Sequence, residues 1–269
     1  MSQTLAAPPA TPAPAAQASK KGHRLEIVTA INQGDREYQQ DQVEMVPHHR
    51  VNGCLALLLA DGMGGKSGGR KASEQVIMTS RQIFDRFVVG QDKATSILLQ
   101  MVSESHLMIR LTAITSEEEP HSTFAGCIIE PDLTLSIAHA GDSRVYHFRD
   151  GKMLSCTKDH SYVQQLVDEG RVPLAEAAAH PQANLLVGCL GTQHEPPQTS
   201  STAQLAVGDC VLVCSDGLWH YYKPEEFARV LTALAPRAAA ELLMTKARTR
   251  ANGRGDNLSM ALVRVVPMP

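Results

Sequence analysis

The sequence predicts an α+β protein in which two face-to-face, mainly antiparallel β-sheets are flanked by α-helices on both sides. Short apolar runs that contain β-branched residues recur along the chain from Arg24 onward. Turn sequences such as EPDL (130–133) and RDGK (149–152) join neighbouring runs, as in β-hairpins. Two long stretches with helical spacing separate the groups of strands. Grouped strands with helices between the groups favour two packed sheets with helices outside them.

The expected strands are apolar runs at 24–31, 54–60, 122–130, 133–140, 144–149, 209–215 and 258–266. A helix is expected over 67–89, where apolar residues recur at helical spacing, and another over 92 to about 115. A second helical pair is expected over 224–234 and 237 to about 251. Between these groups, Val163, Leu166 and Val167 share one helical face before Gly170, and a short helix is expected over 173–179.

Composition limits the function classes that remain open. Residues 1–21 are rich in Ala and Pro and predict a disordered tail, whereas 22–269 predict one domain with a sizeable core. The net charge of −3 gives no reason to expect binding to nucleic acid or to a membrane surface. The chain shows no signal peptide, no membrane-spanning run and no CxxC pair among its six cysteines. We therefore expect a cytoplasmic protein with reduced thiols.

Four aspartates stand beside glycine at the ends of apolar runs. Asp61 follows CLALLLA, Asp142 follows LSIAHAG, Asp216 follows VLVCS, and Asp256 precedes NLSMALV. A single Asp-Gly pair is typical of a turn. Four carboxylates at one rim of a sandwich would repel one another unless a cation neutralised them. Because no Cys or His accompanies them, the set favours Mg²⁺ or Mn²⁺ over zinc, and Gly62 leaves room for its backbone carbonyl to join.

Seven motifs in chain order resemble those of the metal-dependent protein phosphatases of the type 2C class, above all compact, stand-alone bacterial members. They are GDREYQQD (34–41), DGMGG (61–65), STFAG (122–126), AGDSRVY (140–146), KDHSYVQQLVDEG (158–170), SDGLW (215–219) and GDNLS (255–259). The resemblance spans roughly residues 22–266. It implies a phosphatase-like catalytic domain that removes phosphate from phosphoserine and phosphothreonine in proteins. It also implies a role in signal transduction, opposite a Ser/Thr kinase, and a monomeric state.

The same resemblance implies the roles of the aspartates. Asp61 would bridge two Mn²⁺ or Mg²⁺ ions, the Gly62 carbonyl would join the first ion, and Asp216 and Asp256 would complete the pair. Asp142 resembles the ligand of a third ion, which we expect to be weaker. A hydroxide shared by the bridged ions would then attack phosphorus in line, without a covalent enzyme intermediate.

Arg36 stands where the family has its phosphate-binding arginine, and a guanidinium can hold two phosphate oxygens at once. We expect Asp41 and Gln40 to lie behind the metal ligands. Asp41 would reach the ions through water or pair with Arg36. Gln40 replaces the family's more usual glutamate and so removes one negative charge. Met63 and Lys66 stand where relatives carry histidines, so the group that protonates the leaving oxygen is unassigned.

Two histidines could be taken for catalysts, and two other functions remain as alternatives. His139 and His160 lie in the IAHAGD and KDHS motifs, and we interpret them as hydrogen-bonded structural residues rather than catalysts. The segment after KDHS resembles the family's flap, which either shapes substrate access or packs on the sheet. A pseudophosphatase that only binds phosphoproteins is one alternative, although all four aspartates are present. A metal-dependent phosphodiesterase or nuclease is the other, although the expected basic surface and His ligands are lacking.

Overall fold

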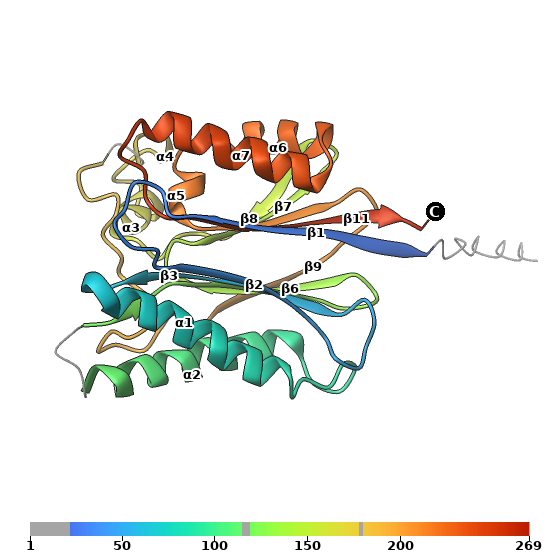
Figure 1. Cartoon of the computed structure of the whole chain (residues 1–269), viewed down its shortest axis with the longest axis horizontal. Helices are drawn as coiled ribbons and strands as arrows, with labels where there is room; N and C mark the ends of the chain where they lie inside the picture. The colour runs from blue at the N-terminus through green and yellow to red at the C-terminus, as the bar shows by residue number, and fades with distance from the viewer. Residues whose placement is uncertain (1–21, 115–118, 178–179, 269) are drawn as a thin grey trace, which may run out of the picture.

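The computed structural model describes residues 22–114, 119–177 and 180–268; the expected tail, 1–21, lies outside the described residues. Two antiparallel sheets pack face to face, and helices cover the outer face of each sheet (Figure 1). This arrangement confirms the predicted α+β class and its flanking helical layers.

The upper sheet of Figure 1 has the strand order β1-β11-β10-β7-β8. Its strands are β1 (His23–Asn32), β11 (Leu258–Pro267), β10 (Cys210–Cys214), β7 (Arg144–Arg149) and β8 (Lys152–Cys156). The lower sheet has the order β2-β3-β5-β6-β9, with β4 paired to β3. Its strands are β2 (Asp41–Pro47), β3 (Leu55–Met63), β4 (His121–Ser122), β5 (Phe124–Ile129), β6 (Thr134–Ala140) and β9 (Thr199–Gln204).

The helices divide between the two outer faces and one end. Helices α1 (Gly65–Phe84) and α2 (Ala94–Ile114) cover the lower sheet, while α6 (Pro224–Ala233) and α7 (Pro236–Ala251) cover the upper sheet (Figure 1). Three short helices, α3 (Tyr162–Asp168), α4 (Leu174–Ala177) and α5 (Asp216–Trp219), lie toward the left end in Figure 1. The four long helices match the predicted ranges to within a few residues, and α3 and α4 fall in the expected flap.

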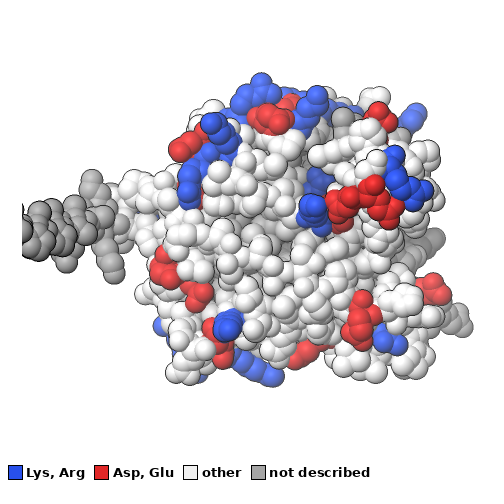
Figure 2. Space-filling model, turned by 180° about the vertical axis from the view of Figure 1, so that it is seen from behind, with Lys and Arg blue, Asp and Glu red and all other residues white. Residues whose placement is uncertain are grey.

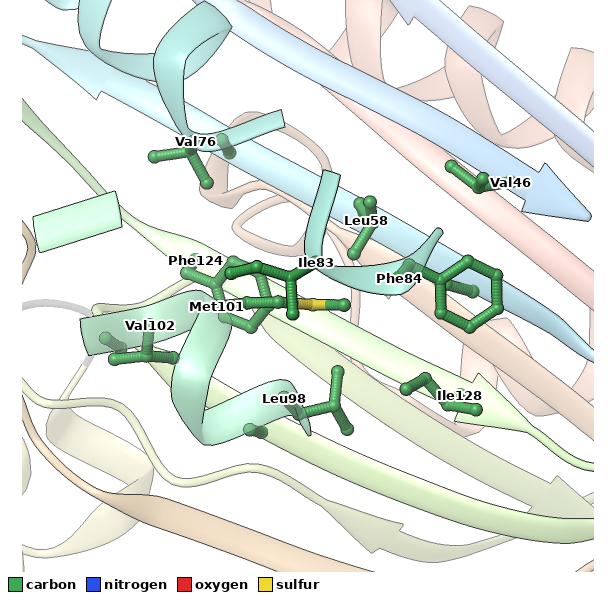
Figure 3. Packing of buried hydrophobic residues seen from close by; sticks show 14 of the residues in the cluster. Val46, Leu58, Val76, Ile83, Phe84, Leu98, Met101, Val102, Phe124 and Ile128 are labelled. Atoms are coloured by element: carbon green, nitrogen blue, oxygen red, sulfur yellow. The ribbon is translucent and has the colours of Figure 1, made fainter. Parts of the chain in front are cut away.

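Apolar side chains fill three layers between these elements. Because strand residues alternate faces, Leu57 and Leu59 of β3 point into the core between the sheets, whereas Leu58 points to the layer below. In that lower layer Leu58 packs with Phe84 of α1 and Met101 of α2 (Figure 3). The apolar run before Asp61 is therefore buried on both faces, which explains its composition.

The sequence analysis missed three strands, and all three lie at sheet edges. β2 and β9 are the two edges of the lower sheet, and β8 is one edge of the upper sheet. The side chains of β8 and β9 are mostly exposed, and their sequences, KMLSC and TSSTAQ, are correspondingly polar. An edge strand needs fewer apolar residues, so its sequence signal is weak.

The surface carries both signs of charge. On the face drawn in Figure 2, Lys and Arg are interspersed with Asp and Glu rather than gathered into a broad basic area. Among the described helices, none is long and apolar enough to cross a membrane.

Candidate metal centre

A cavity of about 570 Å³ opens at the end of the sandwich where β3 ends and β11 begins. It brings together all the predicted site residues except Asp41. The described residues that line it are Arg36, Glu37, Tyr38, Gln40, Asp61, Gly62, Met63, Gly64, Gly65, Asp142, Asn184, Leu186, Asp216, Asp256 and Asn257. Motifs separated by most of the chain length therefore meet in one hollow, as the resemblance implies.

Strand ends of both sheets deliver the four aspartates. Asp61 lies near the end of β3 in the lower sheet, and Asp142 lies in the turn that joins β6 of the lower sheet to β7 of the upper sheet. The other two, Asp216 at the start of α5 just after β10 and Asp256 just before β11, come from the upper sheet. The cavity therefore exists because the two sheets pack with these strand ends at the same rim.

Close backbone packing explains the glycines beside the aspartates. A Cβ atom on Gly62 would lie 2.0 Å from the carbonyl oxygen of Gly69, in the first turns of α1. A Cβ on Gly217 would lie 1.9 Å from the carbonyl oxygen of Asn257. These two positions have no room for a side chain. The backbone beside Asp61 packs directly on α1, and the backbone beside Asp216 packs directly on the segment at Asn257.

Burial and mutual repulsion raise the pKa values of the carboxyl groups. Burial, followed by the charges of Asp41 and Asp216, raises the pKa of Asp61 well above its ordinary value. Burial, followed by the charge of Asp256, raises the pKa of Asp216 to about 6. The pKa of Asp142 is also raised well above its ordinary value, by burial and then by Asp216. The carboxyl groups of Asp61 and Asp216 are close enough to share a hydrogen bond.

This excess of negative charge fits divalent cations. Arg36 is the one Lys or Arg among the described residues that line the cavity. The aspartates supply the hard oxygen donors that Mg²⁺ and Mn²⁺ prefer. Within the described part of the chain, no three His, Cys, Asp or Glu side chains are grouped as ligands of one ion. Each ion would therefore complete its coordination with backbone carbonyl oxygens and waters, which both cations accept.

The Arg36 guanidinium lies at the cavity wall and pairs with Asp256 rather than Asp41. Its Nη2 donates to Asp256 Oδ2 at 2.5 Å. This hydrogen bond and the charge of Asp256 raise the pKa of Arg36, so the guanidinium stays charged. Its side chain is 62% exposed, so it remains accessible to a ligand that enters from solvent.

Asp41 lies behind the cavity wall, fully buried and opposite Asp61 in the β2–β3 pair. Its Oδ2 accepts hydrogen bonds of 2.7 Å from the hydroxyls of Ser215 and Ser259, which flank Asp216 and Asp256 in their motifs. Its Oδ1 has no hydrogen-bond partner among the described residues. Burial raises the pKa of Asp41 to about 7, despite these hydroxyls. The free oxygen leaves Asp41 able to accept one further hydrogen bond, for example from a water.

The sequence analysis did not assign Asn257, which holds the loop at 33–40 against its own loop at the start of β11. Its side-chain oxygen accepts a hydrogen bond from the backbone amide of Gln40 at 2.7 Å. Its Nδ2 donates to the backbone carbonyls of Gln33 and Tyr38. The loop that carries Arg36 is thereby fixed beside Asp256. Burial was the missing signal, since Asn257 is 4% exposed and a buried amide needs partners.

Gln40 and the two residues at the histidine positions complete the rim. The Gln40 side chain donates from Nε2 to the Gly65 carbonyl at 2.8 Å, a bond that a glutamate could not make in its ionised form. Met63 lines the cavity, whereas the side chain of Lys66 lies outside the described part of the structure. Neither position identifies a group that protonates the leaving oxygen.

Fold and site together define a four-layer sandwich of two sheets and two helical layers, with a carboxylate-lined cavity of the kind that holds divalent cations. Comparison with known families assigns it further. The protein phosphatase 2C family matches residues 31–248, most of the chain, and the chain belongs to that family.

Named relatives are bacterial protein phosphatases. The serine/threonine protein phosphatase PstP of Mycobacterium tuberculosis is 34% identical over 215 residues, which cover 80% of this chain. Protein phosphatase PhpP of Streptococcus pneumoniae is 28% identical over 242 residues, which cover 89% of this chain and 96% of PhpP. A crystal structure of the PstP catalytic domain with two manganese ions matches with a TM-score of 0.75 and 29% identity, over 90% of this chain and 98% of that domain.

The chain spans 41% of the length of the PstP relative that it matches. The shared part is thus comparable in extent to the PstP catalytic domain, of which 98% is covered. What the whole PstP protein does beyond this part does not transfer to the chain.

Proposed function

We propose that this protein is a metal-dependent serine/threonine protein phosphatase that hydrolyses phosphoserine and phosphothreonine in proteins. One observation carries the proposal: four aspartates from both sheets and one arginine line a single cavity, although they are spread from position 36 to position 256. The family match and the names of the relatives support the same activity.

Arg36 binds the phosphate in this proposal. Its exposed guanidinium faces solvent at the cavity wall and can hold two phosphate oxygens, while Asp256 fixes its orientation from the other side. Asn257 holds the backbone around Arg36 in place through the carbonyls of Gln33 and Tyr38. The phosphoryl group would thereby sit between Arg36 and the aspartates.

The aspartates hold the cations. Asp61 would serve both ions of a bridged pair, with the Gly62 carbonyl at one ion and with Asp216 and Asp256 completing the pair. When bound, two Mn²⁺ or Mg²⁺ ions supply positive charge for the phosphate oxygens and lower the pKa of water. The manganese ions in the PstP catalytic domain support this assignment. Asp41 would orient a water toward the cavity through its free Oδ1, while Gln40 fixes the glycine loop at Gly65.

Asp142 would hold a third, weaker cation. It lines the same cavity on the side of the flap, where the preceding Gly141 accepts a hydrogen bond from the His160 amide. An ion there would keep more of its waters and gain less Coulomb energy.

Partners and setting follow from the activity. Phosphoproteins and a Ser/Thr kinase that phosphorylates them are the proposed partners, and we propose a monomeric, cytoplasmic, single catalytic domain over 22–269. The pseudophosphatase alternative is not supported, since all four aspartates line the cavity and the named relatives are phosphatases. A nuclease is disfavoured by the interspersed charges in Figure 2 and by a cavity lining without histidine among the described residues.

Phosphate release from phosphoserine and phosphothreonine peptides, measured with Mn²⁺, with Mg²⁺ and with a chelator, tests the proposal. We expect turnover with either metal ion and none with chelator, while the far-ultraviolet circular dichroism stays unchanged. Peptide binding without turnover under all metal conditions would instead identify a pseudophosphatase. Cleavage of phosphodiesters in preference to phosphopeptides would identify a nuclease-type enzyme.

A further inference from the structure

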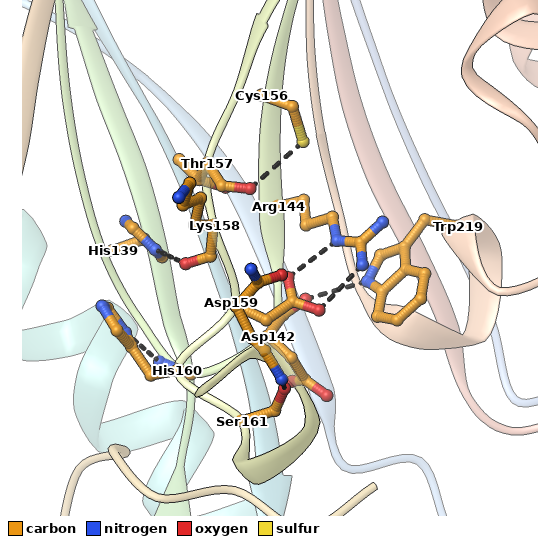
Figure 4. Close-up of polar contacts among 12 residues, drawn as sticks. His139, Asp142, Arg144, Cys156, Thr157, Lys158, Asp159, His160, Ser161 and Trp219 are labelled. Carbon is orange, nitrogen blue, oxygen red and sulfur yellow. Dashed lines mark hydrogen bonds and ion pairs between the residues drawn. The ribbon is translucent and has the colours of Figure 1, made fainter. Parts of the chain in front are cut away.

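The loop that carries Asp142 is held from two sides by contacts that the proposed mechanism leaves unused. Both carbonyl groups that flank the Asp142 Cα accept a hydrogen bond. Gly141 O accepts from the His160 backbone amide at 2.9 Å, and Asp142 O accepts from Trp219 Nε1 at 2.8 Å. Figure 4 shows His160 on one side of this loop and Trp219 on the other.

On the first side, the His160 ring adds a second bond to the loop. Its Nδ1 accepts from the Gly141 amide at 3.2 Å. Because Nδ1 is the acceptor, the neutral ring carries its proton on Nε2, which lies 3.0 Å from Thr199 Oγ1 in β9. The ring also stacks on His139, with centroids 4.4 Å apart. Burial and the neighbouring His139 lower the pKa of His160 to about 4, so this acceptor is available at neutral pH.

On the second side, Arg144 fixes the indole of Trp219. The guanidinium carbon lies 3.5 Å from the centroid of the Trp219 rings, a cation–π contact. Its Nε and Nη2 each donate at 2.7 Å to Asp159, and its Nη1 donates to Tyr146 at 3.1 Å. The indole therefore cannot rotate away from Asp142 without breaking this stack.

Both sets of contacts on the Asp142 loop begin at two adjacent residues, Asp159 and His160. Asp159 holds Arg144 and thereby Trp219, and His160 holds Gly141, so residues 159–160 connect to Asp142 along two routes. Gly141 has φ +105°, a left-handed conformation that a free loop leaves easily. The segment thus restrains the 141–142 part of the turn, while a hydroxyl bond of 2.7 Å between Ser143 and Thr123 holds the part that follows.

We propose that His160 and Trp219 are positioning residues that hold the Asp142 carboxylate toward the cavity from two sides, with Arg144 and Asp159 supporting Trp219. This inference rests on the proposed function, because Asp142 is taken there as the ligand of the third cation. Neither positioning residue is among the described residues that line the cavity, so both act through Asp142. Their loss should weaken the Asp142 site while the Asp61, Asp216 and Asp256 carboxylates keep their places.

The first measurement needs neither metal nor activity. Amide hydrogen exchange at Gly141, followed by NMR in the metal-free protein, reports the bond to His160 directly. We expect His160→Ala to accelerate that exchange by roughly tenfold, the effect of losing one hydrogen bond. In His160→Asn the amide oxygen can take the place of Nδ1 and should restore much of the protection. Thr199→Val is the matched control, since it removes only the partner of Nε2, and should stay within about twofold of wild type.

The second measurement is the Mn²⁺ concentration for half-maximal turnover. We expect His160→Ala and Trp219→Phe each to raise it by roughly fivefold to tenfold, with turnover recovering at saturating Mn²⁺. Phenylalanine keeps a ring for Arg144 but lacks the indole N–H. In an Asp142→Ala background neither substitution should shift the Mn²⁺ curve further, because the site that they position is gone.

The outcomes separate this inference from the proposed function. Unchanged Gly141 exchange and an unchanged Mn²⁺ curve in His160→Ala would overturn the positioning roles, even if the wild type is fully active. A further shift in the Asp142→Ala background would overturn them too, since the residues would then act elsewhere. Wild-type protein without phosphatase activity would contradict the proposed function, and the exchange data would still decide whether His160 restrains the loop. If His160→Ala does not fold, Trp219→Phe, alone and in the Asp142→Ala background, carries the test through the Mn²⁺ curve.

Discussion

Two aspartates flank the same strand, β10: Asp209 is fully buried, Asp216 is half-buried at the cavity, and they differ in what surrounds them. Asp209 precedes the strand and accepts hydrogen bonds of 2.7 Å from His147 and, at both oxygens, from Arg149. Asp216 follows the strand and faces other carboxylates across the cavity. Burial acts to raise the pKa of Asp209, but the bonds from Arg149 and His147 outweigh it and lower that pKa. At Asp216, burial and Asp256 raise the pKa to about 6.

The difference separates a carboxylate that holds the fold together from one that is available for function. The guanidinium of Arg149 and the ring of His147 satisfy Asp209, so it can bind nothing else. Among the described residues that line the cavity, the one cationic side chain, Arg36, pairs with Asp256 rather than with Asp216, and a soluble divalent cation would supply the missing positive charge. Burial acts to raise the pKa of both carboxyl groups, and the partners of each one decide what it does.

The largest expected effect is on catalysis. Asp61→Asn should lower kcat at least ~10³-fold at saturating Mn²⁺, because Asp61 is proposed to serve both ions and its loss removes the activated water. Turnover measured with a phosphopeptide checks this. The same substitution should leave the metal-free fold intact or more stable, since it removes one of several repelling charges. Activity within tenfold of wild type would contradict the two-metal assignment.

The matching change at the other end of β10 should affect stability instead. Asp209→Asn should lower the free energy of unfolding by about 2 kcal/mol, because it removes the buried carboxylate that accepts hydrogen bonds from Arg149 and His147. Urea unfolding in the presence of a chelator measures this, with Asp216→Asn as the control. We expect Asp216→Asn to cost no stability under those conditions. Equal losses in both variants would show that the two ends of β10 do not differ as described.

The two ends should also respond oppositely to pH in metal-free protein. The pKa values of Asp216 and Asp41 are raised to about 6 and about 7, so their contribution is fully present below about pH 4 and is lost as pH rises through those values. Over that range each of these carboxyl groups holds a proton in the folded state that it has lost in the unfolded state. Each such group lowers the free energy of unfolding by about 1.4 kcal/mol per pH unit. The lowered pKa of Asp209 gives a contribution that is present above about pH 4 and lost in acid.

Half-buried His160 contributes the opposite slope between about pH 4 and pH 6.5, because its pKa is lowered. The test is therefore the difference in unfolding free energy between wild type and Asp216→Asn across this range. We expect Asp216→Asn to lose less stability than wild type as pH rises. Parallel pH profiles would contradict the raised pKa of Asp216.

Arg36→Ala probes the one cationic side chain in the described cavity lining. We expect kcat/KM to fall by roughly tenfold to a hundredfold, the effect of losing hydrogen bonds to a charged group. A change mainly in KM would mean that Arg36 grips the phosphate in the ground and transition states alike, and a fall in kcat would mean that the grip tightens in the transition state. An unchanged kcat/KM would reduce Arg36 to a loop residue paired with Asp256.

The smallest catalytic effect is expected at Asp142. Asp142→Ala should keep two tightly bound ions, lower turnover by about tenfold and raise the Mn²⁺ concentration for half-maximal rate. Calorimetric titration with Mn²⁺ together with an activity curve measures both. Loss of all metal binding would place Asp142 in the central pair, and an unchanged metal dependence would leave it as a turn residue.

The sequence predicted most of the fold because central strands and amphipathic helices carry strong periodic patterns. The runs at 54–60 and 258–266 became β3 and β11, which are buried on both faces, whereas the polar edge strands β8 and β9 escaped notice. The meeting of Asp61, Asp142, Asp216 and Asp256 in one cavity was also predicted. The serines that hold Asp41 and the amide network of Asn257 were not, although SDGLW and GDNLS contain them.

By itself the sequence determined which residues could carry the chemistry: four aspartates placed beside glycine at strand ends, and one arginine in GDREYQQD. Only the tertiary structure decided which partners they have. Arg36 pairs with Asp256 across 220 positions, Asp41 accepts from Ser259 across 218, and Trp219 holds Asp142 across 77. Local sequence sets the propensity for helix or strand and the face on which a side chain lies. The partner of a carboxylate depends instead on which distant strands the packing of the two sheets brings beside it. The pKa and the role of that carboxylate follow from its partner.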